Sequence, residues 1–350
     1  MDPEHPSLTY ICEVHPHHAA HHALYRMVSE MGAVRIGRKR RYGPRSVFSL
    51  RCDRWIFRLS GNSTYTVHNL LDECRAGLSI LSRPGSVVHV IYGDDGFRYL
   101  GVMNGVRGAR IIASLHQPPA VFDRRVAWKT YLRRLSAAHV VARVQIPFLS
   151  NYIPEERIFF IPHPVDADFF CPDPSVAKTG RRCIFAGQWL RDFGLLEETV
   201  RRVHAADPSV QFTLVTFPER FPPFEGMPNV ELRSGISDEE LRALYRRADL
   251  LLLPLEECTF NNSMLEGMAC GLPVVTNDIG GVRDYADPSC AVLLKRGCGG
   301  GEMAGAVLAL LGDARARGEM AVRARERALA VHWERIMPDY LRMYRTVAGA

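Results

Sequence analysis

Residues 250–276 read LLLLPLEECTFNNSMLEGMACGLPVVT. An apolar run opens this stretch, a polar loop follows, and the residues after the loop have the composition of a short helix. Asn262 or Ser263 can cap that helix, and Gly271 suits the position after its end. A second apolar run comes next. The order strand, loop, helix, strand predicts a βαβ unit with both strands in one parallel sheet.

The same alternation of short apolar runs and amphipathic segments continues in both directions along the chain. Short apolar runs of this kind suit strands that are buried on both faces of a parallel sheet. The runs in the first half are 8–14, 86–92, 110–115 and 138–144, and those in the second half are 183–186, 212–216, 230–232, 250–255 and 274–276. We therefore predict an α/β protein with two doubly wound domains.

A stretch rich in proline and acidic residues, IPHPVDADFFCPDP at 161–174, separates the two halves. We predict one Rossmann-like domain over residues 1–160 and a second over residues 161–332. Residues 333–350 have helical spacing and are expected to cross back to the first domain. Domains of this type bind ligands beyond the carboxyl ends of their strands, so we expect the two to face a central cleft.

Composition excludes several classes of protein. The chain has 350 residues, 47% hydrophobic and 23% charged, which is ordinary for a globular protein. No run of 18 uncharged apolar residues predicts a transmembrane helix, and the first residues lack the pattern of a secretory signal. Nine cysteines without a CxxC pair favour reduced thiols over disulfides or a thiolate zinc site. We expect a cytoplasmic protein.

The net charge of +6 is distributed unevenly. Residues 1–150 carry 21 Lys and Arg against 10 Asp and Glu, a net of +11, which leaves −5 for residues 151–350. The cations are densest at 38–45. They form either a solvated loop or a patch for an anionic acceptor or an anionic membrane, with which the protein would make peripheral contact. No zinc-finger or RNA-binding pattern accompanies them, so we predict no nucleic-acid partner.

The segment from Glu266 to Val275 resembles the signature of the retaining glycosyltransferases of family 4. In that signature a Glu is followed by Ala-Met-Ala-Cys-Gly-x-Pro-Val-Val, and here Gly267 stands at the first Ala. The resemblance extends to 161–166, 228–230, 248–249, 277–282 and 333–335. It implies the GT-B fold, in which two Rossmann-like domains face a central cleft.

The resemblance also implies an activity. A hexose would pass with retention of configuration from a UDP- or GDP-linked donor to a hydroxyl of a small molecule, a lipid-linked saccharide or a glycan. No cofactor is implied besides the nucleotide sugar, which is a co-substrate. No metal ion is implied either, because a helix N-terminus and side-chain donors can hold the pyrophosphate.

The family's functional residues correspond to particular positions here. Glu266 would bind the nucleotide ribose. Asn261, Asn262 and Ser263 would lie along the sugar and the pyrophosphate of the donor. His116, at the end of an apolar strand in the first domain, would contact the transferred sugar near the reacting centre.

The sequence departs from the family where a first acid should stand, eight residues before Glu266. That position is Cys258. Glu257 lies one residue away and would hold the sugar hydroxyls if the loop were shifted. The amides of Asn261 and Asn262 are the alternative.

A second departure concerns the family's Gly-Arg…Lys-Gly segment, which corresponds to 187–194. Gly187 is retained, but Gln188 and Phe193 replace the two cations that grip the diphosphate. Arg191 could supply one cation. Its alternative role is an ion pair on the surface with a neighbouring acid, Asp192 or Glu198.

The first domain offers two further candidates on the acceptor side. Asp94 follows the apolar run 86–92 and could orient an acceptor hydroxyl or form a turn beside glycine. The segment HPHHAAHH at 15–22 holds His18, which we assign to the acceptor side, with a polar helix start as the alternative. His18 and His22 have the spacing of metal ligands, but nothing nearby completes a site, so we predict no metal.

Two other functions remain open. A sugar-nucleotide epimerase or hydrolase could use the same scaffold and would turn over the donor alone. A non-catalytic subunit that binds a sugar nucleotide or a glycan would explain the replaced residues at 188, 193 and 258.

Overall fold

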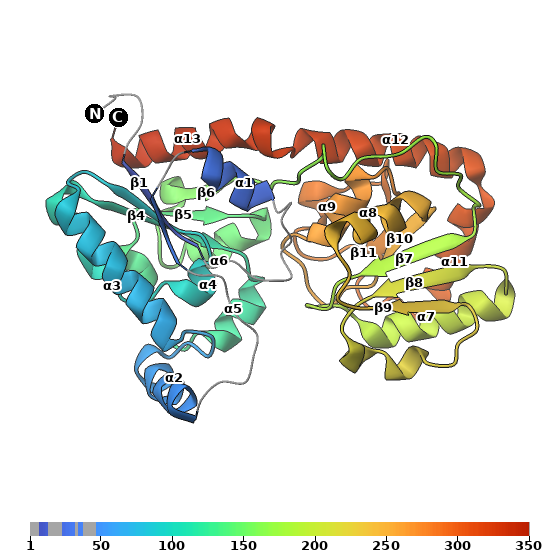
Figure 1. The fold of residues 1–350 in the computed structure, drawn as a ribbon, viewed down its shortest axis with the longest axis horizontal. Helices are drawn as coiled ribbons and strands as arrows, with labels where there is room; N and C mark the ends of the chain where they lie inside the picture. The colour runs from blue at the N-terminus through green and yellow to red at the C-terminus, as the bar shows by residue number, and fades with distance from the viewer. Residues whose placement is uncertain (1–6, 13–22, 32–33, 38–46, 350) are drawn as a thin grey trace. The chain divides into compact units, whose positions relative to one another are not determined.

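The computed structural model describes residues 7–12, 23–31, 34–37 and 47–349. Two compact units divide it. Unit 1 comprises Leu8–Ile11, Leu24–His163 and the chain from Ile336 onward, and unit 2 comprises Pro164–Arg335. Each contains one six-stranded sheet whose strands all pair in parallel, with helices packed on it (Figure 1). Among the described residues, no helix has the length and apolarity to span a membrane.

The sheet of unit 1 has the strand order β2-β1-β3-β4-β5-β6, which reverses direction between β1 and β3. Its strands are β1 (Leu8–Ile11), β2 (Val34–Ile36), β3 (Val87–Val90), β4 (Arg110–Leu115), β5 (Ala137–Val140) and β6 (Ile158–Phe160). Its helices are α1 (Ala23–Glu30), α2 (Val47–Ser60), α3 (Val67–Ser82), α4 (Gly93–Gly96), η1 (Leu100–Met103), α5 (Pro119–Arg125), α6 (Ile146–Leu149) and most of α13 (Trp333–Ala348).

The sheet of unit 2 has the order β12-β11-β10-β7-β8-β9, which reverses between β7 and β10. Its strands are β7 (Arg182–Ala186), β8 (Gln211–Val215), β9 (Val230–Arg233), β10 (Leu250–Leu253), β11 (Val274–Asn277) and β12 (Ala291–Leu294). Its helices are α7 (Phe193–Ala206), α8 (Asp238–Arg247), α9 (Asn262–Ala269), α10 (Val282–Tyr285), α11 (Gly300–Gly312) and α12 (Ala314–Ala330). The prediction of two doubly wound domains is confirmed.

Every predicted strand is present, and three more were missed. The missed strands are β2, β6 and β12, at the edges of the two sheets. Edge strands are partly exposed, and β2 and β6 span only three residues each. Only β2, with the sequence VRI, lacks a continuous apolar run. The strands β6 (IFF) and β12 (AVLL) are apolar but short and only partly buried, and they were not predicted from the sequence.

A chain of buried hydrogen bonds ties α13 to the sheet of unit 1. The carbonyl of Ile161 accepts from His139 Nε2 at 2.9 Å, so His139 Nδ1 accepts from Ser114 Oγ at 2.6 Å. Ser114 Oγ in turn accepts from His89 Nε2 at 2.7 Å, which leaves His89 Nδ1 to accept from the Tyr344 hydroxyl at 2.7 Å. One carbonyl thus sets both tautomers, and the chain requires both imidazoles to be neutral.

These two histidines make the stability of the fold depend on pH. Burial lowers the pKa of His139 to about 3 and holds that of His89 well below its usual value. Below about pH 6.5 the unfolded chain binds two protons that the folded chain excludes. The free energy of unfolding should therefore fall by about 2.7 kcal/mol for each pH unit below that point. Urea denaturation between pH 7.5 and 5 measures this slope.

The double variant His89→Gln and His139→Gln isolates the contribution of these two residues from that of the other histidines. Its slope over the same pH range should be smaller by about the same 2.7 kcal/mol per unit. An equal slope in the variant and the wild type would show that the buried pair is not the cause.

Candidate functional site

The two loops that leave β7 and β10 meet at the point where the strand order of unit 2 reverses. The amide of Asp192 donates to the carbonyl of Pro254 at 3.1 Å, and the amide of Glu256 donates to the carbonyl of Leu190 at 3.0 Å. Such a reversal creates a crevice beyond the carboxyl ends of the strands, where open α/β sheets bind ligands. The candidate residues of unit 2 lie in or beside these loops.

Helix α9 follows the loop that leaves β10, and its N-cap is Asn261. The Asn261 Oδ1 atom accepts from the backbone amide of Met264 at 3.1 Å. The expectation that Asn262 or Ser263 caps the helix is therefore wrong. Both residues lie in the first turn of α9 instead, Asn262 half-buried and Ser263 buried. Asn261 has the extended backbone that a cap requires, whereas Asn262 is already helical.

The nitrogen of the Asn261 side-chain amide, Nδ2, has no hydrogen-bond partner in the described structure. Its Oδ1 accepts both from Met264 and, at 3.0 Å, from Arg191 Nη2, so two donors fix the orientation of the amide. Nδ2 itself is buried. A buried amide donor without a partner costs free energy, which a ligand oxygen at the N-terminus of α9 would recover.

Arg191 lies under the Gly187 turn. Its guanidinium donates to the carbonyl of Trp189 at 2.9 Å, to that of Ala186 at 3.4 Å and to Asn261. Gly187 has φ +104°, and a Cβ atom there would lie 2.7 Å from Arg191 Nη2, so glycine is required. Burial lowers the pKa of Arg191 to about 10, and the side chain stays cationic at neutral pH.

The alternative role of Arg191 as a surface ion-pair partner is not what the structure contains. Asp192 caps α7 by accepting from the amide of Leu195 at 2.8 Å, and Glu198 pairs with Arg202 at 2.8 Å. Both acids are therefore engaged elsewhere, and the guanidinium of Arg191 points to the cap of α9.

Glu266 lies one turn beyond the cap of α9. Its Oε2 atom accepts from the hydroxyl of Tyr245, on α8, at 3.2 Å. Burial raises the pKa of Glu266 to about 7, the charge of Asp238 adds to this rise, and the Tyr245 hydrogen bond opposes it. The carboxylate is thus a desolvated acceptor beside the crevice.

Two glycines of this region lie close to their neighbours. A Cβ atom on Gly267 would lie 2.8 Å from Leu251 Cδ2, so an alanine there would require the Leu251 side chain to shift. Gly280 has φ +52°, and a Cβ atom there would lie 1.9 Å from the carbonyl oxygen of Cys258. The amide of Gly281 donates to the same oxygen at 2.9 Å.

Neither residue at the position of the missing acid offers a free carboxylate. Glu257 Oε1 accepts from Arg296 at 3.0 Å. Cys258 is buried, and burial raises the pKa of its thiol to about 12. The assignment of Glu257 as a substrate ligand would require it to leave Arg296.

The segment after β7 shows why Phe193 stands where the family has a lysine. Phe193 packs edge-on against Phe185, with ring centroids 5.5 Å apart, and Arg220 lies over its ring at 4.7 Å. The lysine position of the family is therefore part of an apolar contact here. Gln188, at the arginine position, is half-buried directly after Gly187.

In unit 1, Asp94 and His116 lie together at the carboxyl end of β4. The Asp94 carboxylate accepts from the backbone amides of His116 at 2.6 Å and Gln117 at 3.1 Å. The His116 ring is buried, with Nδ1 3.6 Å from the carboxylate and the Tyr92 ring 5.2 Å away. Asp94 thus holds the turn that carries His116. His18 lies outside the described residues.

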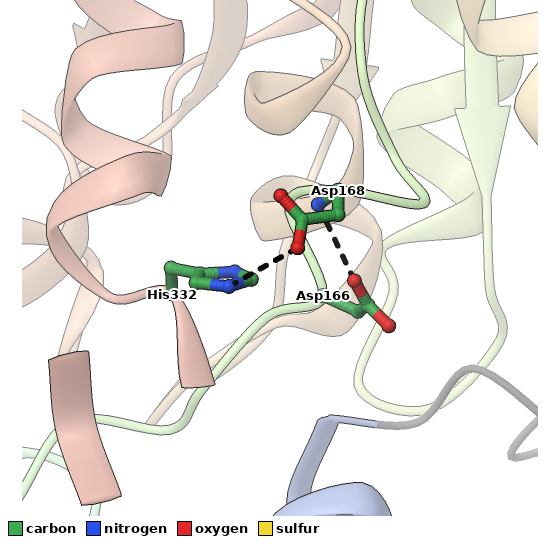
Figure 2. Close-up of side chains that lie close together, drawn as sticks. All are labelled: Asp166, Asp168 and His332. Atoms are coloured by element: carbon green, nitrogen blue, oxygen red, sulfur yellow. Dashed lines mark hydrogen bonds and ion pairs between the residues drawn. The ribbon is translucent and has the colours of Figure 1, made fainter. Parts of the chain in front are cut away.

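A cluster of metal-ligand type lies within unit 2. Ligand atoms of Asp166, Asp168 and His332 lie within 4.8 Å of one another (Figure 2). His332 Nδ1 accepts from the amide of Ala167 at 3.1 Å, so its proton is on Nε2, which points to Asp168 at 3.5 Å. A protonated Nε2 cannot ligate a cation, and we assign the cluster to structure.

Residues 180–313 match the family described as glycosyl transferases group 1. This part of the chain is similar to a group 1 glycosyl transferase domain. A curated relative, the D-inositol 3-phosphate glycosyltransferase of Geodermatophilus obscurus, is 29% identical over 219 residues, which are 55% of this chain and 48% of that protein. The chain thus matches about half the length of that relative.

Solved structures extend the likeness to both units. Sucrose-phosphate synthase from Thermosynechococcus elongatus is 18% identical, with a TM-score of 0.72, over 98% of this chain and 99% of that one. HepE from Anabaena, solved in complex with UDP, is 11% identical, with a TM-score of 0.70, over 97% of this chain and 100% of that one. The segment 180–313 is therefore part of a two-domain Rossmann-like GT-B fold, as expected.

Sequence reasoning missed Tyr245 as a partner of Glu266. Tyr245 is the one residue of α8 that is fully enclosed, and its hydroxyl needs a partner when buried. In the sequence, Tyr245 has the helical spacing of a core residue of α8, and this spacing does not indicate a polar partner. Only the packing of α8 beside α9 shows which acid it meets.

Proposed function

We propose that this protein is a retaining glycosyltransferase. It moves a hexose from a nucleotide-sugar donor, UDP- or GDP-linked, to a hydroxyl of an acceptor. The observation that carries the proposal is the buried Asn261 Nδ2 without a partner at the N-terminus of α9, within the segment that is similar to group 1 glycosyl transferases. The HepE structure, which holds UDP, supports a nucleotide as the ligand class.

The diphosphate of the donor would lie against the first turn of α9. Amide groups there favour an anion, Asn261 Nδ2 supplies a further donor, and Arg191 supplies a cation. A guanidinium is a strong phosphate partner because it combines charge with directed hydrogen bonds. This set of groups would replace the two cations that Gln188 and Phe193 lack, and it would work without a metal ion.

The ribose of the donor would bind to Glu266. A carboxylate accepts hydrogen bonds from two neighbouring hydroxyl groups, and the Tyr245 hydroxyl orients it. Ser263 lies next to this pair in the first turn of α9.

The chemical step would retain configuration by a front-face reaction. The bond between the anomeric carbon and the diphosphate oxygen breaks as the acceptor oxygen bonds to that carbon on the same face. The acceptor proton passes to the departing phosphate oxygen. His116 and Asn262 would position the transferred sugar, and neither acts as an acid or a base in this scheme.

A second function is favoured by one observation. The position of the family's first acid is the buried Cys258, and the neighbouring Glu257 pairs with Arg296, so no carboxylate stands at that position. A subunit that binds a sugar nucleotide without transferring the sugar would tolerate this loss. An epimerase would instead release a changed donor when no acceptor is present.

Thermal unfolding with millimolar UDP, GDP, ADP or TDP tests the donor site. A nucleotide at 100 times its Kd should stabilise the protein by about 2.7 kcal/mol. The same shift is expected in excess EDTA. Product analysis with the matching nucleotide sugar then separates the three functions: transfer to an acceptor, turnover of donor alone, or binding without turnover. No shift with any nucleotide would contradict a donor site in unit 2.

A further inference from the structure

Helix α3 of unit 1 buries its two acidic residues together with Ala76 and Ile80, and it exposes three of its four leucines. Asp72 and Glu73 are buried, whereas Leu71, Leu78 and Leu81 are 44%, 68% and 50% exposed. At 100° per residue these leucines fall within an arc of about 80°. A surface helix that only covers the core of a soluble protein turns its large apolar residues inward and its charged residues outward.

Both buried acids have polar partners, and the hydrogen bonds of Glu73 to residues outside α3 hold this side of the helix against the rest of unit 1. Glu73 accepts from the Tyr65 hydroxyl at 2.6 Å and from the amides of Arg98 and Tyr99 at 2.6 and 2.9 Å. Asp72 pairs with Arg75 at 2.8 Å. The leucine stripe consequently faces outward as part of the folded structure.

Helix α2 continues the same kind of surface. Asp53 on α2 accepts from the amide of Val67, at the start of α3, at 3.0 Å. Beyond that contact, Trp55 and Leu59 lie four residues apart on α2 and are 67% and 60% exposed. The two helices adjoin in Figure 1. Clustered exposed apolar residues of this kind mark interaction surfaces.

The charge of this surface is of one sign. Between residues 55 and 122, every exposed Asp, Glu, Lys or Arg is an arginine, and the exposed arginines are Arg58, Arg75, Arg83 and Arg107. Arginine beside tryptophan and leucine on a helix is the composition of segments that lie in the interface of a membrane with anionic lipids.

We propose that the α2–α3 face of unit 1, defined by Trp55, Leu59, Leu71, Leu78 and Leu81, binds the surface of a membrane that contains anionic lipids. The leucines and the tryptophan enter the boundary between headgroups and acyl chains, and the arginines contact lipid phosphates. A second copy of the chain is a poorer occupant, because pairing this face with itself would bring arginines against arginines. The proposal does not depend on the activity proposed above.

Sedimentation with vesicles tests this face in the full-length protein. The probes are vesicles of phosphatidylcholine alone and vesicles with about one third phosphatidylglycerol. The protein should bind the anionic vesicles only, and binding should weaken in 0.5 M NaCl because screening reduces the attraction. Binding to both vesicles alike, or to neither, would overturn the proposal.

Variants locate the surface. Leu78→Gln with Leu81→Gln keeps helix-forming residues at exposed positions and should weaken vesicle binding roughly tenfold. Arg58→Gln with Arg83→Gln should weaken it and reduce its dependence on salt. The matched control is Val322→Gln, which changes a residue 58% exposed on α12 of unit 2 and should have no effect.

Two outcomes would refute the assignment. One is vesicle binding that Leu78→Gln with Leu81→Gln leaves unchanged while thermal unfolding shows an intact fold. The other is a wild-type dimer in light scattering that the same double variant converts to a monomer, which would make this face a contact between copies.

Discussion

Arg191→Ala should lower kcat/KM for the nucleotide sugar roughly 100-fold. The substitution removes the cation beside the cap of α9 and also frees Asn261 Oδ1 from one of its two donors. Asn261 would then lose the constraint that directs its Nδ2 toward the ligand. Steady-state kinetics with the nucleotide sugar identified by the thermal shifts measures the loss.

Two controls separate charge from positioning at Arg191. Arg191→Lys keeps a cation but loses the planar fork, so it should recover only part of the activity. Arg181→Ala removes an exposed arginine of the same unit, which pairs with Asp207 at 2.6 Å, and should leave kinetics unchanged. Kinetics of Arg191→Ala equal to those of the wild type would mean that the diphosphate binds elsewhere.

Glu266→Ala should weaken donor binding at least tenfold, or ~1.4 kcal/mol. Charge-assisted hydrogen bonds from the ribose hydroxyls would be lost, and the Tyr245 hydroxyl would be left without its acceptor. Isothermal titration with the nucleotide measures the affinity. Glu266→Gln keeps the shape of the side chain, so its donor affinity should lie between those of the wild type and Glu266→Ala. An unchanged Kd for Glu266→Ala would refute the ribose assignment.

The same carboxylate predicts a pH dependence. The pKa of Glu266 is raised to about 7 in the free protein, mainly by burial, and ribose hydroxyls donate to its ionised form. Donor affinity should therefore be highest above pH 7 and fall as the pH drops below it. Tyr245→Phe removes the hydrogen bond that lowers this pKa, so the midpoint should move to higher pH. An unchanged midpoint in Tyr245→Phe would show that Tyr245 does not influence the pKa of Glu266.

Much of the site was predictable because its residues are neighbours in sequence. The loop and helix at 256–270 contain Asn261, Asn262, Ser263 and Glu266, and their spacing alone sets them around one helix N-terminus. The cap itself was wrong by one or two residues, because Asn262 or Ser263 was predicted and Asn261 caps the helix. Asparagines at adjacent positions have the same capping propensity, and only the backbone angles distinguish Asn261 from Asn262.

The amino-acid sequence by itself determined the two parallel sheets and the helix that begins at the switch point of unit 2, because both follow from periodicity and spacing over a few residues. The partners inside the site depended on tertiary structure. Arg191 meets Asn261 across 70 residues, Tyr245 meets Glu266 across 21, and the leucines of α3 face outward. Such pairings depend on how strands order within a sheet and on which residues of two packed elements lie opposite each other, and no local pattern encodes either.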